Sequence, residues 1–182
     1  MSHEKIYFHI SFRNSLSQLF KYRPEKFAFL NIWRTYMQNH FETCAYTLLP
    51  GRFECVIGVS KSLAADQNEV TSLIKKILST KMEGAWDSGD ISRFCESLRM
   101  KQLFTEKECI YRIFDLHTLP QKIGISTDYR TYPFSSYKAL SSVQSTVLSK
   151  TTVWQWFGGR MRFAAFHQAY AGWTRPEVSL AG

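Results

Sequence analysis

Three stretches of the chain have a pattern of apolar, aromatic and β-branched residues that is typical of β-strands. The first is residues 5–14, KIYFHISFRN, and the other two are residues 41–49 and 52–60. Only a Pro-Gly pair separates the last two, which predicts a β-hairpin. In the strand 52–60 the odd-numbered positions are apolar and share one face. Arg52 and Glu54 are therefore expected together on the other face.

Apolar residues recur at helical spacing in three further segments. Pro24 opens the first helix, and the second helix spans about residues 65–80. Thr105 is an N-cap for the third helix because acidic residues follow it in the positive first turn, and Pro120 ends that helix. On the third helix, Tyr111 and Asp115 are four residues apart and share one face.

The remaining segments complete the order of elements. Residues 81–90 are expected to be a loop, and residues 97–104 a further strand. The order strand, helix, hairpin, helix, strand, helix predicts an α+β fold of the ferredoxin-like or split βαβ type. Such a sandwich has an antiparallel sheet with helices on one face. A C-terminal helical appendage, broken by Gly158 and Gly159, is expected to follow.

Composition limits the organisation of the chain. With 182 residues, of which 45% are hydrophobic and 15% aromatic, it has the material for one sizeable core. We expect a single domain over residues 1–182, with a core of about 5–140 and the appendage at about 150–170. No window approaches the roughly 18 to 20 apolar residues of a membrane span, and the start MSHEK lacks an apolar signal core. A cytoplasmic protein without a membrane partner is the expectation.

The four cysteines are scattered along the chain without any Cys-x-x-Cys pair. In a cytoplasmic protein such cysteines behave as small hydrophobic residues. We therefore expect reduced core residues rather than a zinc site or a disulfide framework.

The charge favours a nucleic-acid partner. The chain has a formal net charge of +8, and its pI is near 9.4. The basic residues that we expect to contribute a phosphate-binding surface are Arg13, Lys21, Arg23, Lys75, Lys76, Arg99 and Lys101. The alternative is an ordinary solvated basic surface.

Several stretches resemble one known family. They are AYTLLPGRFECVIGV, LHTLPQKIGI and above all YPFSSYKALSSVQSTVLSKTTVWQWFGGRMRFAAFHQ. These stretches resemble the REP-associated and insertion-sequence tyrosine transposases, the single-strand HUH family, and the similarity covers about residues 6–168. The resemblance implies a cytoplasmic, dimeric DNA transposase. In that family two strand histidines hold a divalent metal on the scissile phosphate, and a helix tyrosine attacks it.

This chain departs from the family at each of those positions. The family's His-hydrophobic-His pattern is replaced by Arg52, Phe53 and Glu54, and Asp115 stands where the tyrosine is expected. A guanidinium is never a metal ligand, so we expect an Arg52–Glu54 ion pair and no metal site. Magnesium on Glu54 is the alternative. Tyr111, one helical turn away, is the alternative nucleophile.

Three functions are compatible with the sequence. The first is a catalytically inactive transposase relative that binds single-stranded or hairpin DNA, as a homodimer and without a cofactor. The second is an active transposase with relocated catalytic groups, which would need a divalent metal such as magnesium. The third is a protein-interaction or regulatory domain whose basic surface is incidental.

Overall fold

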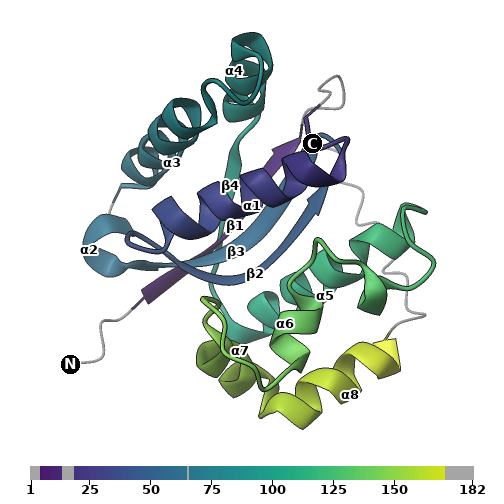
Figure 1. Ribbon diagram of the computed structural model, residues 1–182. Coiled ribbons are helices and arrows are strands. Elements are labelled where there is room, and N and C mark those ends of the chain that lie inside the picture. Colours follow the sequence, from purple (N-terminus) through teal and green to yellow (C-terminus); the bar gives the residue numbers. More distant parts are fainter. Residues whose placement is uncertain (1–4, 14–18, 65, 171–182) are drawn as a thin grey trace, which may run out of the picture.

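A four-stranded antiparallel sheet forms the centre of the protein (Figure 1). The computed structural model describes residues 5–13, 19–64 and 66–170. The strands are β1 (Lys5–Arg13), β2 (Glu42–Leu49), β3 (Arg52–Ser60) and β4 (Arg99–Leu103), in the order β2-β3-β1-β4. This order and the alternating helices confirm the ferredoxin-like α+β fold.

The register of β1 separates two faces of the sheet. Phe8 pairs with Ile57 of β3, whereas the neighbouring His9 pairs with Val56 of β3 and Lys101 of β4. Because successive residues of a strand point to opposite faces, Phe8 and Ile57 face one side and His9 and Lys101 the other. The first side is apolar. The second side carries the polar residues discussed below.

Four helices belong to the apolar side. They are α1 (Arg23–Met37), α2 (Lys61–Ala64), α3 (Gln67–Met82) and α4 (Ser88–Glu96). Phe29 and Trp33 of α1 and Ile74 of α3 are buried in the same core as Phe8. The helical stripes predicted for the first two helices therefore cover the sheet as expected.

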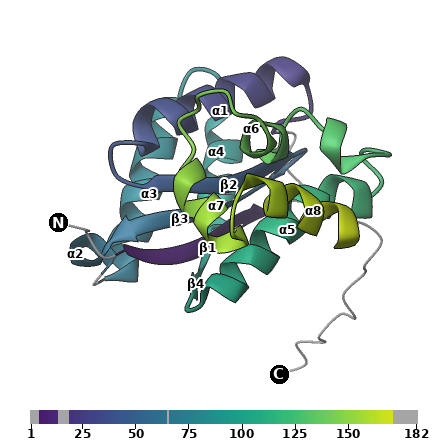
Figure 2. The ribbon, with the colours of Figure 1, turned by 90° about the horizontal axis from the view of Figure 1, so that it is seen from below.

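The C-terminal helices lie on the opposite side of the sheet, as Figure 2 shows with α1 and α5 on either side of the strands. They are α5 (Glu106–Lys122), the short 3-10 helix η1 (Tyr129–Thr131), α6 (Tyr137–Ser141), α7 (Lys150–Phe157) and α8 (Arg160–Tyr170). Val56 of β3, Ile113 of α5 and Phe163 of α8 share a second core. The sheet is therefore covered on one face by α1, α3 and α4, and partly covered on the other by α5 and the appendage. The helices of the sandwich were expected on one face, whereas α5 packs on the opposite one.

Two expectations about element boundaries were wrong. Residues 81–90 are not a continuous loop, because α3 runs to Met82 and α4 begins at Ser88, where the side chain of Asp87 accepts hydrogen bonds from the first turn. Pro120 does not end α5, which continues to Lys122. Proline removes only one backbone donor, and the Pro120 carbonyl still accepts from the Ile125 amide at 2.9 Å.

Other local predictions are confirmed. The two hairpin strands pair directly, with Leu49 opposite Arg52. The break in the appendage is a left-handed cap, because Gly158 ends α7 with φ +74°, a conformation that costs glycine little. All four cysteines are free and buried. No helix among the described residues has the length and hydropathy that a membrane span requires.

The cap of α5 yields a first prediction. Thr105 Oγ1 accepts a hydrogen bond from the Glu108 amide at 3.1 Å, and the Glu108 side chain returns to the Thr105 amide. Thr105→Ala removes the acceptor and is expected to lower the free energy of unfolding by about 1 kcal/mol. Urea denaturation measures the change. Thr80→Ala, at an exposed position within α3, is the matched control and should change stability by less than about 0.5 kcal/mol.

Candidate nucleic-acid interface

A buried carboxylate, Glu54, lies at the centre of the polar face of the sheet. Only 2% of the residue is exposed. Its Oε1 accepts from Arg52 Nε at 2.7 Å and from Arg13 Nε at 3.0 Å, and its Oε2 lies 3.0 Å from His9 Nε2. We call His9, Arg13, Arg52 and Glu54 the Glu54 cluster. The predicted Arg52–Glu54 ion pair is confirmed, and its carboxylate is buried.

The charges within the Glu54 cluster follow from its environment. Burial alone raises the pKa of Glu54, but the hydrogen bond with His9 and the charges of Arg52 and Arg13 outweigh burial and lower that pKa to about 2. Burial lowers the pKa of His9, and the nearby Arg112 charge adds to that effect. His9 is therefore a neutral ring that donates its Nε2 proton to the carboxylate. One anion and two guanidinium cations leave the cluster with a net charge of +1.

A divalent metal does not fit the Glu54 cluster. Both carboxylate oxygens already contact donors, and two of those donors are guanidinium groups, which repel a cation. Metal sites need several carboxylate, imidazole or thiolate ligands. Among the described residues no group of three such side chains lies together. The net positive charge of the cluster favours an anion over a cation at this site.

The two α5 residues considered as nucleophiles have structural contacts. Asp115 Oδ1 accepts from Lys122 Nζ at 3.2 Å, so the carboxylate is paired. The ring of Tyr111 packs edge-on against Phe166 of α8, with 6.0 Å between the ring centroids. Tyr111 thus contributes to the packing of the appendage on α5.

The structure brings together only part of the predicted phosphate-binding set. Arg99 and Lys101 of β4 pair with Ser11 and His9 of β1, so they share the polar face with Arg13. Lys21 and Arg23 lie at the start of α1, 5.6 Å and 5.5 Å from the ring centroids of Tyr22 and Phe27. Lys75 and Lys76 lie on α3, in the layer on the opposite side of the sheet, where they line a cavity with α4.

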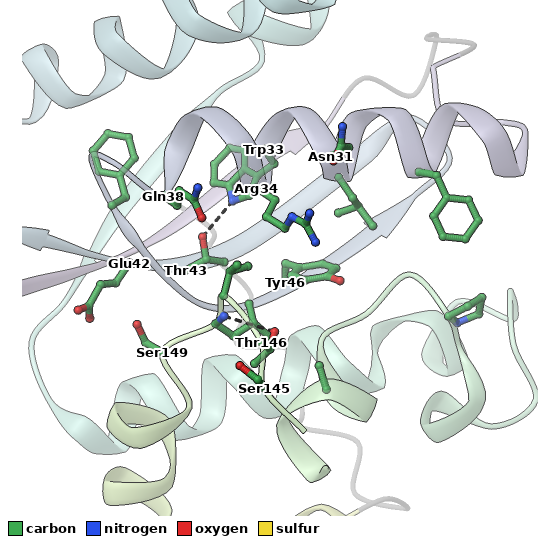
Figure 3. Close-up of a pocket in the computed structure, with 17 residues that line it drawn as sticks. Asn31, Trp33, Arg34, Gln38, Glu42, Thr43, Tyr46, Ser145, Thr146 and Ser149 are labelled. Carbon is green, nitrogen blue, oxygen red and sulfur yellow. Dashed lines mark hydrogen bonds between the residues drawn. The ribbon is translucent and has the colours of Figure 1, made fainter. Parts of the chain in front are cut away.

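A groove of about 820 Å³ lies between α1, β2 and residues 145–149 (Figure 3). Trp33 forms part of its wall and donates Nε1–H to Thr43 Oγ1 at 3.0 Å. Its charged lining residues are Arg34 and Glu42, and Glu42 is also paired with Lys5. Because the two lining charges are opposite, this groove lacks the excess of positive charge that a phosphate backbone requires.

A buried chain of hydrogen bonds joins the appendage to the sheet. The Phe163 carbonyl accepts from His167 Nδ1 at 2.9 Å, so the neutral ring accepts at Nε2 from His117 Nδ1, also at 2.9 Å. His117 Nε2 then accepts from Ser136 Oγ at 2.8 Å, and Ser136 Oγ accepts from the Tyr46 amide. Burial lowers the pKa of both rings, to about 4 for His167. The two histidines are 50 residues apart in the chain, and no local pattern indicated that they pair.

Comparison with known proteins supports the fold. No protein-family model matches the chain, and no curated protein matches it. Among solved structures, it is similar to a REP-associated tyrosine transposase bound to a REP hairpin, with a TM-score of 0.51 and 16% sequence identity. The similarity covers 81% of this chain and 85% of that chain. The chain therefore has a fold related to that of a tyrosine transposase.

Proposed function

We propose that this protein binds single-stranded or hairpin DNA through the polar face of its sheet and does not cleave it. The observation that carries the proposal is the Glu54 cluster, in which Arg52 and Arg13 both pair with the buried Glu54 carboxylate. By the resemblance, Arg52 and Glu54 stand at the positions of the family's metal histidines. The similarity to a structure bound to a REP hairpin supports DNA as the partner. The resemblance also supports a homodimer, which sedimentation of the purified chain would test.

The charges of the polar face favour a phosphate backbone. Arg13, whose side chain is 57% exposed, reaches from the Glu54 cluster to solvent. Arg99 and Lys101 extend the same face along β4 and are both exposed. Phosphate contacts of this kind position a protein on DNA without reading sequence, and they make binding strongly dependent on salt.

The same residues argue against strand cleavage. Metal-dependent phosphoryl transfer to a side chain needs a cation near the phosphate and a nucleophile that can later be displaced. Arg52 and Arg13 surround the only carboxylate of the cluster, and Asp115 would give a high-energy acyl phosphate. The protein is thus proposed to be a relative of the transposases that has lost its catalytic groups. It needs no metal or other cofactor to bind DNA.

The test combines DNA binding with a cleavage assay. Hairpin oligonucleotides are expected to bind with an affinity that falls steeply between low and physiological salt. No covalent protein–DNA band is expected on a denaturing gel with magnesium or manganese. Replacing Arg13, Arg99 and Lys101 together by glutamine should weaken binding by roughly tenfold or more. The Lys75→Gln, Lys76→Gln variant, altered on the opposite side of the sheet, is the control.

Other outcomes would identify the alternative functions. A covalent band from the unmodified chain that disappears in Tyr111→Phe would show an active transposase with a relocated nucleophile. If the protein binds no DNA, the function that remains compatible with the sequence is that of a protein-interaction or regulatory domain. Activity regained only after Asp115→Tyr is combined with Arg52→His and Glu54→His would show that the rest of the ancestral pocket is intact.

A further inference from the structure

A small pocket lies beside the Glu54 cluster, between β4 and the first turns of α5. Its volume is about 290 Å³. Its charged lining residues are Lys101, Lys107, Glu108, Arg112 and Asp115. Three of them are cations and two are anions. We call this cavity the β4–α5 pocket.

Both anions of the β4–α5 pocket are engaged. Glu108 Oε2 accepts from the backbone amides of Phe104 and Thr105, at 2.6 Å and 3.3 Å, as part of the cap of α5. Asp115 is paired with Lys122. The two carboxylates are therefore compensated by groups other than the cations of the pocket, so they oppose the entry of an anion less than free carboxylates would.

The cations lack such compensation. Among the described residues, no carboxylate lies within ion-pair distance of Lys101, Lys107 or Arg112. Arg112 is half-buried, and its Nε is buried without a hydrogen-bond partner, so packing rather than an acidic partner holds this guanidinium. An uncompensated, partly desolvated guanidinium is costly alone and is stabilised by an anion.

The β4–α5 pocket adjoins the Glu54 cluster. The charge of Arg112 is near enough to His9 to lower the pKa of that ring, and Lys101 is the β4 partner of His9. An anion in the pocket would therefore lie near His9 and on the same face of the sheet as Arg13. Successive phosphates of one strand can occupy neighbouring sites of this kind.

We propose that the β4–α5 pocket is a metal-free phosphate-binding site, in which Lys101, Lys107 and Arg112 hold one phosphate group of the DNA. Arginine suits this role because its planar donors bind two phosphate oxygens at once, and the two lysines supply point charges. The identification of the ligand as a DNA phosphate rests on the DNA-binding function proposed above. The affinity of the pocket for a phosphate group does not rest on that function, because it depends on these side chains alone.

Two measurements test the pocket separately from the function. In the first, inorganic phosphate is titrated into the unmodified chain while backbone amide NMR shifts are followed, and saturable shifts are expected over residues 101–112. In the second, the affinity for a hairpin oligonucleotide is measured for Lys101→Gln, Arg112→Gln. A loss of roughly tenfold or more and a salt slope smaller by about two are expected.

The variants include controls for folding and for general charge. Lys101→Gln, Lys107→Gln alters only exposed side chains and tests the site if Arg112→Gln impairs folding. Arg112→Lys keeps the charge but loses the planar donors, and it should bind hairpin DNA with intermediate affinity. Lys75→Gln, Lys76→Gln removes two charges elsewhere and should change affinity by less than about twofold.

The outcomes separate the two proposals. The phosphate-site proposal is overturned if Lys101→Gln, Arg112→Gln binds hairpin DNA as well as the unmodified chain does. It is also overturned if phosphate causes no shifts at the pocket of the unmodified chain. Either result leaves the proposed DNA-binding function standing. Phosphate-induced shifts in a chain that binds no DNA would overturn the proposed function and leave the phosphate site standing.

Discussion

Glu54→Gln is expected to lower the free energy of unfolding by about 3 kcal/mol at pH 7. The native cluster holds the pKa of Glu54 at about 2, against an ordinary value of 4.5, and each pKa unit corresponds to about 1.4 kcal/mol. Glutamine keeps the shape of the side chain but removes the charge that Arg13 and Arg52 share. Losing one partner of a buried charge network is costly because the remaining charges stay partly desolvated.

The pH dependence of this effect has a defined sign. A carboxylate whose folded pKa is depressed contributes stability above its unfolded pKa, and this contribution is lost as pH falls toward the folded value. The difference in the free energy of unfolding between the native chain and Glu54→Gln should therefore be largest above about pH 4.5 and vanish toward pH 2. Urea denaturation at a series of pH values measures this difference.

Glu83→Gln provides the matched control for Glu54→Gln. Glu83 is exposed, at the end of α3, so its neutralisation should change stability by less than about 0.5 kcal/mol. A Glu54→Gln variant as stable as the native chain would contradict the view that the Glu54 cluster is a strongly coupled network. Equal losses for both variants would point to overall charge rather than to the cluster.

The buried histidine pair is expected to make the protein lose stability between pH 6.5 and pH 4. His117 and His167 are both fully buried, and each ring is neutral in the folded chain. Because their folded pKa values are depressed, the unfolded chain binds more protons in this range, and stability falls with pH. His167 alone, with its pKa lowered from 6.5 to about 4, accounts for about 3 kcal/mol.

His167→Gln tests this assignment. An amide offers one acceptor for His117 Nδ1 and one donor for the Phe163 carbonyl, but it does not titrate. The free energy of unfolding of the variant should depend less steeply on pH between 6.5 and 4.5, a window in which Glu54 does not yet titrate in the unfolded chain. The remaining slope is expected from His117 and His9, whose pKa values are also lowered.

The control for His167→Gln is His40→Gln, which replaces an exposed histidine after the end of α1. Its pH dependence should match that of the native chain. If His167→Gln and the native chain lose stability in parallel down to pH 4.5, the buried pair is not the source of the acid sensitivity. Near-UV circular dichroism would also show whether the aromatic packing around α8 is retained in each variant.

Local patterns determined the elements of this protein. The alternation in residues 52–60 fixed both the strand and the faces of Arg52 and Glu54, because side chains of a strand must alternate. The Pro-Gly pair determined the hairpin, and Thr105 determined the start of α5. The local pattern did not predict α4, because Gly89 in its first turn disfavours a helix. In the structure, the N-cap Asp87 and the packing of Phe94 in the core stabilise this helix.

The resemblance gave the positions of the candidate site but not its partners. That Arg52 and Glu54 stand at metal-ligand positions is what the resemblance implies, and the spacing of the two residues predicted that they share one face. The other members of the cluster, His9 and Arg13, are more than 40 residues distant from Glu54 in the chain. They reach the carboxylate only through the pairing of β1 with β3, a long-range register that no local periodicity encodes.

The amino-acid sequence by itself determined the basic charge, most of the helices and strands, and their ferredoxin-like order. The tertiary structure decided which charges are neighbours. It buried Glu54 among two arginines, placed Arg99 and Lys101 beside them and put Lys75 and Lys76 on the other side of the sheet. The physical reason is that propensity and periodicity act over a few residues, whereas charge coupling depends on distance in space and on the exclusion of water.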